Sequence, residues 1–172
     1  MDTEKITLHW TAGRYEPNKC DLANYHILIK EDGSFVKTHQ FSETLEYSCY
    51  MENTDNIQIS LCGMLGANPD DFGEYPITKK QIEAMIELCA VIVLMRGIKY
   101  WKIKTHAERA IEKDYFPIKW DFACLRPCRQ VSKLTAIETG RNLRKRILYR
   151  ISELNGNDIK NHPLYYKLTK GV

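Results

Sequence analysis

Residues 105–121, THAERAIEKDYFPIKWD, are the stretch around which the rest of the chain is organised. His106 stands two residues before Glu108, a loop is expected to follow, and Lys119 and Asp121 flank a tryptophan. A neutral imidazole binds a divalent metal through a ring nitrogen, and a carboxylate adds an oxygen ligand. His106 and Asp121 are therefore candidate metal ligands.

A third ligand must come from elsewhere in the chain, because a catalytic zinc takes three protein ligands and leaves one position open. His9 in the segment ITLHWTAG is the best candidate, since residues 5–10 predict a short strand that presents it rigidly. Spacing alone is a weak signal in a chain with 5 His and 22 Asp plus Glu. On composition alone, three such residues without a metal are the commoner case.

Signals on the N-terminal side of this stretch predict how His106 is positioned. Thr78 and Gln81 form a capping box, and apolar residues follow at helical spacing. A helix is therefore expected from Thr78 to Gly97, where the glycine provides a stop. Residues 100–105 then return as a strand that ends at His106. Both candidate histidines are expected at the ends of neighbouring strands.

On the C-terminal side, residues 125–130 are irregular and contain a proline. A second capping box, Thr135 with Glu138, predicts a helix that reaches about Leu154, and the sequence leaves the remaining tail open. One face of this helix is apolar and the other is basic, with Arg141, Arg144, Lys145, Arg146 and Arg150. Such a face is most often solvated surface, and contact with an anionic polymer is the alternative.

The N-terminal half predicts short strands joined by loops. Asp32 and Gly33 lie between two β-rich runs, which is a hairpin signal. Further strands are expected at residues 25–30, 34–38 and 56–64. Loops are expected at residues 14–24, 39–56 and 66–76, where polar residues, glycine or proline dominate. Together with the two helices, this alternation indicates an α/β fold, and 172 residues are enough for one domain with a proper core.

Composition and charge are those of an ordinary soluble globular protein, with 44% hydrophobic and 27% charged residues. A formal net charge of +3 is too small to indicate nucleic-acid binding. No run reaches membrane-spanning length, and the first ten residues lack an apolar signal region. We therefore expect synthesis in a cytoplasm without a signal peptide, and neither a nucleic-acid nor a membrane partner. The six cysteines do not form a compact disulfide framework, and Cys62 and Cys89 are expected to be buried thiols.

Five segments in order, LHWTAG, NYHILIKEDGSF, NIQISLCG, THAERA and KWD, resemble the type 2 N-acetylmuramoyl-L-alanine amidases. That family includes phage endolysins and the peptidoglycan recognition proteins. The resemblance runs from about residue 5 to residue 125, and its motifs are specific as an ordered set. It implies a central mixed sheet with helices packed on its faces and a zinc ion in a surface groove. It also implies an amidase catalytic domain at residues 1–130, with a helical extension at 131–172 expected to belong to the same domain.

The resemblance implies that Zn²⁺ is held by His9, His106 and Asp121. Some relatives use a cysteine as the third ligand, and Cys124 lies close by in the sequence. The KWD context favours Asp121, and Cys124 remains the alternative.

By the same resemblance, Tyr25 and Lys119 are the functional side chains beside the metal. Hydrolysis of an amide builds negative charge on the carbonyl oxygen, which a lysine or a phenol can stabilise. Tyr25 is expected to orient water or to relay a proton. Glu108 is a candidate for orienting a ligand or for acting as a general base. His26, beside Tyr25, is expected to be structural.

The function implied is zinc-dependent hydrolysis of the amide between N-acetylmuramic acid and L-alanine in peptidoglycan, as in endolysin-like wall lysis. The first alternative is a cytoplasmic amidase that recycles muropeptides. The second is a non-catalytic peptidoglycan-binding module, which the filled third-ligand position disfavours. The expected partner is thus peptidoglycan or a muropeptide, and the protein is expected to be a monomer that acts on the cell wall if it is endolysin-like.

Overall fold

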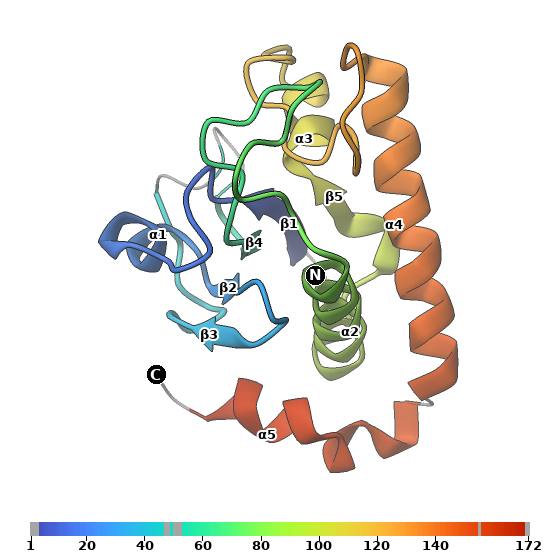
Figure 1. Ribbon diagram of the computed structural model, residues 1–172. Helices are drawn as coiled ribbons and strands as arrows, with labels where there is room; N and C mark the ends of the chain where they lie inside the picture. Colours follow the sequence, from blue (N-terminus) through green and yellow to red (C-terminus); the bar gives the residue numbers. More distant parts are fainter. Residues whose placement is uncertain (1–3, 47–48, 50–52, 155, 171–172) are drawn as a thin grey trace.

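A five-stranded sheet, in the order β3-β2-β4-β1-β5, forms the centre of the computed structural model (Figure 1). The structure describes residues 4–46, 49, 53–154 and 156–170. The strands are β1 (Lys5–Trp10), β2 (Ile27–Ile29), β3 (Phe35–Lys37), β4 (Asn56–Leu61) and β5 (Ile103–Thr105). Four of them are parallel neighbours, and β3 pairs antiparallel with β2 at one edge. The predicted mixed sheet of a single α/β domain is therefore confirmed.

The two longest strands, β1 and β4, lie side by side inside the sheet and are buried along almost their whole length. Parallel strands covered on both faces are expected to be apolar throughout, and Ile6, Leu8, Ile57 and Ile59 follow that rule. The polar side chains buried in the same two strands are the exceptions, and two of them, His9 and Gln58, belong to the site described below.

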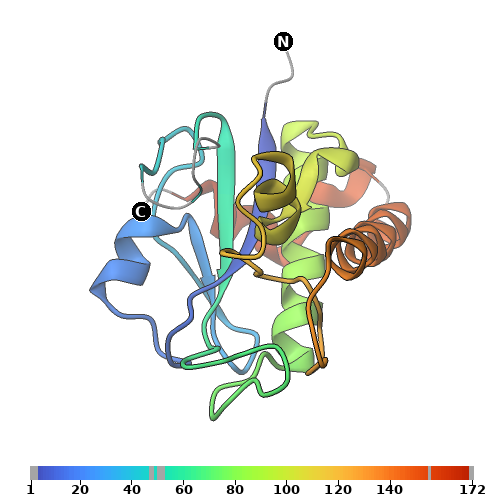
Figure 2. The ribbon, with the colours of Figure 1, turned by 90° about the horizontal axis from the view of Figure 1, so that it is seen from above.

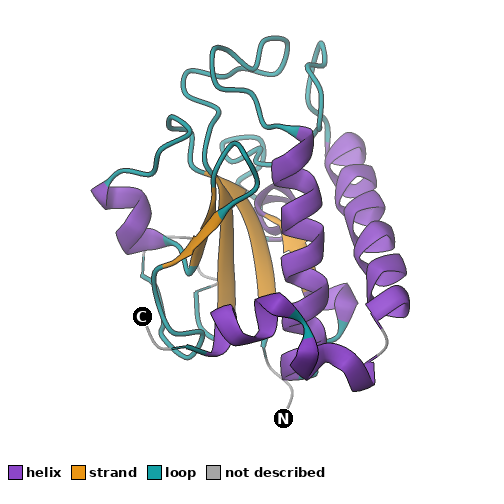
Figure 3. Cartoon of the chain, turned by 60° about the horizontal axis from the view of Figure 1, so that its bottom comes forward, coloured by secondary structure: helices purple, strands orange, loops and turns teal. Residues whose placement is uncertain are grey.

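Helix α2 (Lys79–Arg96) lies against the sheet, and α4 (Lys133–Leu154) packs beside it (Figure 3). The predicted capping box of Thr78 and Gln81 is present, and Gly97 ends the helix in the left-handed conformation. Leu143 and Ile147 of α4 belong to the same hydrophobic core as the strands. The short helix α1 (Lys19–Asn24) and α4 lie at opposite sides of the sheet (Figure 2).

The C-terminal tail, which the sequence left open, is helical. A 3-10 helix, η2 (Gly156–Asn161), and α5 (Pro163–Thr169) run below α2 in Figure 1. Ile159 and Leu168 are buried in the common core. Within the described residues, no helix is both long enough and apolar enough to cross a membrane.

Several predicted boundaries were wrong. The predicted loop 14–24 contains α1, which begins because Asn18 and Asp21 cap each other's backbone N–H groups. The predicted strand 100–105 starts as a 3-10 turn, η1 (Tyr100–Lys102), and only its last three residues pair with β1. Strands predicted at 25–30, 34–38 and 56–64 are shorter at their ends.

The capping box predicted at Thr135 and Glu138 was also wrong, because α4 begins two residues earlier. The Ser132 hydroxyl accepts a hydrogen bond from the Thr135 N–H (3.1 Å), and the Thr135 hydroxyl accepts one from the Ser132 N–H (2.9 Å). The helix ends at Leu154, as the sequence predicted. Residues 47–48 and 50–52 of the predicted loop 39–56 lie outside the described residues.

Helix α3 (His106–Glu112) occupies the first part of residues 105–121, where a loop was expected. Thr105 and Glu108 form a capping box, so the helix begins directly after β5. The Glu108 carboxylate also accepts two hydrogen bonds of 2.7 Å from the Arg144 guanidinium of α4. Arg144 donates a third, of 3.0 Å, to the Ile103 carbonyl of β5. Helix α4 thereby holds β5 and α3 in a fixed relation.

Gly140 allows this close approach, because a Cβ atom there would overlap the Glu108 carboxylate. We expect Gly140→Ala to lower the free energy of unfolding by about 1–2 kcal/mol, since overpacking costs more than the gain in helix propensity. Denaturant titration measures this change. Asn142→Ala, at an exposed position of the same helix, is the matched control and should change little. Equal or higher stability in Gly140→Ala would contradict the packing described here.

Candidate metal centre

Three side chains from distant parts of the sequence meet at one end of the sheet. His9 lies near the end of β1, His106 is the first residue of α3, and Asp121 lies in the following loop. The pairing of Leu8 with Thr105 places the two histidines on neighbouring strand ends, as the sequence predicted. The Ala107 N–H donates to the Asp121 carbonyl (3.1 Å), which fixes the loop against the start of α3. All three side chains are buried.

The donor atoms of this cluster have the spacing of a metal-ligand set. The Nδ1 atoms of His9 and His106 are 3.0 Å apart, and the Asp121 Oδ2 lies 3.3 Å from His106 Nδ1 and 3.7 Å from His9 Nδ1. Tetrahedral zinc with ligands at about 2.0–2.1 Å has ligand–ligand distances of about 3.3–3.4 Å. Two imidazoles and a carboxylate are the donor set of many catalytic zinc sites. The three residues therefore form a cluster that could hold a metal ion, and their donor set fits zinc.

Gln58 of β4 orients the first histidine. Its Oε1 lies 2.7 Å from His9 Nε2. Because an amide oxygen only accepts hydrogen bonds, Nε2 carries the proton and the lone pair of His9 is on Nδ1, which faces the cluster. Sequence reasoning missed Gln58, although a polar residue inside the apolar run NIQISL was the signal that could have found it.

His26 continues this buried network and is structural, as predicted. Its Nδ1 accepts a hydrogen bond of 3.0 Å from the Gln58 N–H, and its Nε2 donates to the Glu43 carbonyl (3.1 Å). Burial lowers the pKa of His26 to about 4, so the ring stays neutral. It therefore supports β4 behind the centre.

Charge in the cluster is divided between the second histidine and the carboxylate. Burial disfavours the charged forms of both, but their mutual attraction prevails: it raises the pKa of His106 to about 9 and holds the pKa of Asp121 well below its usual range. Burial and the neighbouring His106 lower the pKa of His9. With no metal bound, a proton on His106 Nδ1 thus occupies the space between the donors. His106 Nε2 is buried and has no hydrogen-bond partner among the described residues.

A cavity of about 560 Å³ opens over the cluster. Tyr25 and Lys119, predicted to be functional, both line it, and the Tyr25 ring lies 5.4 Å from the His9 ring between centroids. Burial and the charge of Asp121 raise the pKa of Tyr25, so the phenol stays protonated. The remaining wall is mostly apolar or aromatic, with one further carboxylate, and comprises Trp10, Thr11, Ala12, Glu46, Tyr115 and Ile118.

Two other candidates lie apart from the donor atoms. Both oxygens of Glu108 bond to Arg144, and Oε2 also accepts from the Thr105 N–H (3.0 Å). Glu108 therefore positions the start of α3, and these contacts give no support to a role as general base. The Cys124 thiol, the alternative third ligand, contacts Cys128 instead, at 3.0 Å between sulfur atoms.

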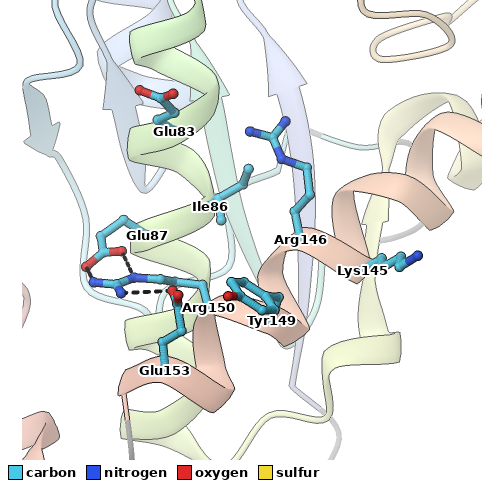
Figure 4. A pocket seen from close by; sticks show the side chains of 8 residues that line it. All are labelled: Glu83, Ile86, Glu87, Lys145, Arg146, Tyr149, Arg150 and Glu153. Atoms are coloured by element: carbon cyan, nitrogen blue, oxygen red, sulfur yellow. Dashed lines mark hydrogen bonds and ion pairs between the residues drawn. The ribbon is translucent and has the colours of Figure 1, made fainter.

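A second hollow of about 570 Å³ lies between α2 and α4 (Figure 4). Arg150 bonds there to Glu87 and Glu153, as the dashed lines show. Its remaining lining comprises Glu83, Ile86, Lys145, Arg146 and Tyr149. The three-donor cluster lies in the other cavity.

Comparison with known proteins gives the family. A family model described as N-acetylmuramoyl-L-alanine amidase matches residues 1–121, which include all three donors. The chain belongs to this amidase family. No curated protein matches it closely in sequence.

Solved structures share the amidase fold at low sequence identity. The E90A mutant structure of PlyL has a TM-score of 0.54 at 13% identity, with 86% of each chain covered. The amidase AmiD from E. coli, solved with anhydro-N-acetylmuramic acid-L-Ala-D-gamma-Glu-L-Lys, has a TM-score of 0.52 at 19% identity. That match covers 68% of this chain and 55% of AmiD.

The hydrogen bond from His9 to Gln58 predicts the effect of substitutions in β4. Gln58→Leu removes the acceptor, so we expect apparent zinc affinity to fall by about 10–100-fold, the range for loss of a partner that orients a ligand. Gln58→Glu keeps an acceptor and should retain most of the affinity. Competition with a chromophoric chelator measures both, with Gln130→Ala as the exposed control. Unchanged affinity in Gln58→Leu would mean that His9 is oriented by other contacts.

The raised pKa of His106 predicts that zinc and a proton compete for the same nitrogen. Since a pKa of about 9 lies above neutral pH, zinc binding at pH 7 should release about one proton. Apparent zinc affinity should then rise about tenfold per pH unit between pH 6 and 8 and level off above pH 9. Calorimetry in two buffers of different ionisation enthalpy counts the protons. Zinc binding without proton release at pH 7 would contradict the charge distribution described here.

Proposed function

We propose that this chain hydrolyses the amide bond between N-acetylmuramic acid and L-alanine in peptidoglycan, with zinc held by His9, His106 and Asp121. The observation that carries the proposal is the convergence of these donors beneath a cavity that His106 and Asp121 line together with Tyr25 and Lys119. Membership of the amidase family supports the bond and the polymer. A bound zinc ion supplies a Lewis acid for a carbonyl oxygen and for water.

Lys119 acts on the carbonyl oxygen of the scissile amide. It is exposed at the cavity wall, from which an ammonium group can approach the substrate without first breaking a buried ion pair. Negative charge grows on the carbonyl oxygen as water attacks, and Lys119 donates a hydrogen bond to it. The interaction is stronger in the transition state than in the ground state, which is the condition for a gain in turnover.

Tyr25 acts as a hydrogen-bond donor. Because its phenol stays protonated, it cannot serve as a base at neutral pH. It lies beside the His9 ring and orients water or relays a proton toward the leaving amine. Glu108 acts at a distance: by capping α3 and bonding to Arg144, it fixes the position of His106.

Endolysin-like cleavage of intact wall is the proposed role, and the recycling of soluble muropeptides is the second candidate. The second is favoured by one specific observation, the AmiD structure with a muropeptide substrate. A non-catalytic binding module is less well supported, because all three donor positions are filled and lie within one cluster.

The test is digestion of purified peptidoglycan and, in parallel, of a soluble muropeptide by zinc-loaded protein, with mass analysis of the bond that is cut. Free lactyl ends of muramic acid paired with free alanine amines are expected. His106→Ala should lose zinc and activity while remaining folded. Peptidoglycan binding without cleavage would identify a binding module, and cleavage of only the soluble substrate would identify recycling.

The division of labour between metal and side chains predicts the phenotype of two variants. Lys119→Ala should keep zinc and Tm but lower turnover by about a hundredfold or more, the scale for one lost oxyanion partner. Tyr25→Phe, which removes only the hydroxyl, should lower turnover with little change in Tm. Lys167→Ala and Tyr149→Phe, at exposed positions, are the matched controls. Near-normal turnover in both site variants would refute these roles.

A further inference from the structure

Two cysteines lie in contact just beyond the third donor of the metal centre. Cys124 and Cys128 have sulfur atoms 3.0 Å apart, and both thiols are free. The segment Leu125-Arg126-Pro127 between them bends the chain back on itself. A disulfide needs a sulfur–sulfur distance of about 2.05 Å, so the two atoms have to close by only about 1 Å.

Contacts on both sides hold this segment in place. The Cys128 N–H donates to the Pro69 carbonyl (2.6 Å), and the Thr139 hydroxyl of α4 donates to the Ala123 carbonyl (3.3 Å). The residue between Asp121 and Ala123 is Phe122, whose side chain is fully buried. The backbone thus presents the two thiols to each other before any bond forms, which favours an intramolecular disulfide over one between molecules.

The other described cysteines lack this arrangement. Cys62 and Cys89 are completely buried, and Cys20 is exposed with its sulfur accepting from Asn24 (3.2 Å). Cys49 is buried near Tyr115, at 4.0 Å from its hydroxyl. Only Cys128 of the contacting pair is half-exposed, and a soluble oxidant can reach it.

We propose that Cys124 and Cys128 are a redox-active pair that forms an intramolecular disulfide with a low-molecular-weight disulfide as oxidant. The half-exposed Cys128 thiolate attacks one sulfur of the oxidant and forms a mixed disulfide, and the first small thiol leaves. Cys124 then attacks the Cys128 sulfur and releases the second small thiol. Two thiols of the protein are oxidised, and one small disulfide is reduced to two thiols, which take up the two protons.

The order of attack follows from exposure. Burial raises the pKa of the Cys124 thiol to about 12, so it forms a thiolate too rarely to react first with a soluble oxidant. Once Cys128 carries the mixed disulfide, the attack by Cys124 is intramolecular and requires little movement. The bond closes a loop of five residues next to Asp121, which restricts the unfolded chain and raises stability modestly.

The experiment treats the full-length reduced protein with glutathione disulfide and follows intact mass, peptide mass and Tm. We expect the loss of two hydrogens, about 2 Da, with Cys124 and Cys128 joined in one peptide, and a rise in Tm of about 2–6 °C. Dithiothreitol should reverse both changes. Cys20→Ser should behave like the parent protein, whereas Cys128→Ser and Cys124→Ser should lose the 2 Da change and the Tm shift.

Three results would overturn the proposal. The first is a protein that carries only glutathione adducts, and the second is a disulfide that joins other cysteines. The third is a thiophilic metal bound in excess of one ion per chain and lost in Cys128→Ser, because a metal-bound pair is not a redox pair. The peptide map of the parent protein decides the first two without any variant, so the test does not depend on how well Cys124→Ser folds.

Discussion

The parallel pairing of β1 with β5 is the constraint on which the candidate site depends. It brings His9 and His106 together across 97 positions of sequence, with ring nitrogens 3.0 Å apart. Burying two imidazole rings at such a short distance is energetically unfavourable unless a proton or a cation lies between them. Asp121 supplies the compensating negative charge from the following loop. The register of two strands therefore fixes both the geometry and the electrostatics of the centre.

The surrounding structure holds this arrangement from two sides. On one side, His26 and Gln58 form a buried polar chain that ends at His9 and leaves its Nδ1 free to bind a metal. On the other, Arg144 of α4 holds Glu108 at the start of α3, two residues from His106. Hydrogen-bonded polar groups rigidify a core, and these two sets do so on either side of the three donors. Helix α4 thereby contributes to the site, although none of its residues lines the cavity over the cluster.

Much of this arrangement could be predicted from the sequence, because the relevant patterns are local. Residues 5–10 read as a strand, and the capping box at Thr78 predicts α2 correctly. The sequence motifs also name the three residues that the structure brings together. The prediction was wrong where a strand and a helix follow each other directly. Thr105 ends β5 and also caps α3, and the helix that begins at His106 was predicted to be a loop.

The parts that could not be predicted depend on contacts between distant residues. Gln58 is 49 positions from His9, and Arg144 is 36 positions from Glu108, so no spacing rule connects them. Gly140 reads as a weak point in a helix until the Glu108 carboxylate is seen beside it. The same limit applies to Cys124, whose sequence position near Asp121 is compatible with a ligand. Only the contact with Cys128 shows which partner it has.

The central claim is that His9, His106 and Asp121 form one zinc site. X-ray absorption at the zinc edge of the stoichiometrically loaded protein tests it most directly. We expect two imidazole nitrogens and only light-atom neighbours, at about 2.0–2.2 Å, and no sulfur. A sulfur neighbour at about 2.3 Å, or a spectrum unchanged in the variant His106→Ala, would contradict the account.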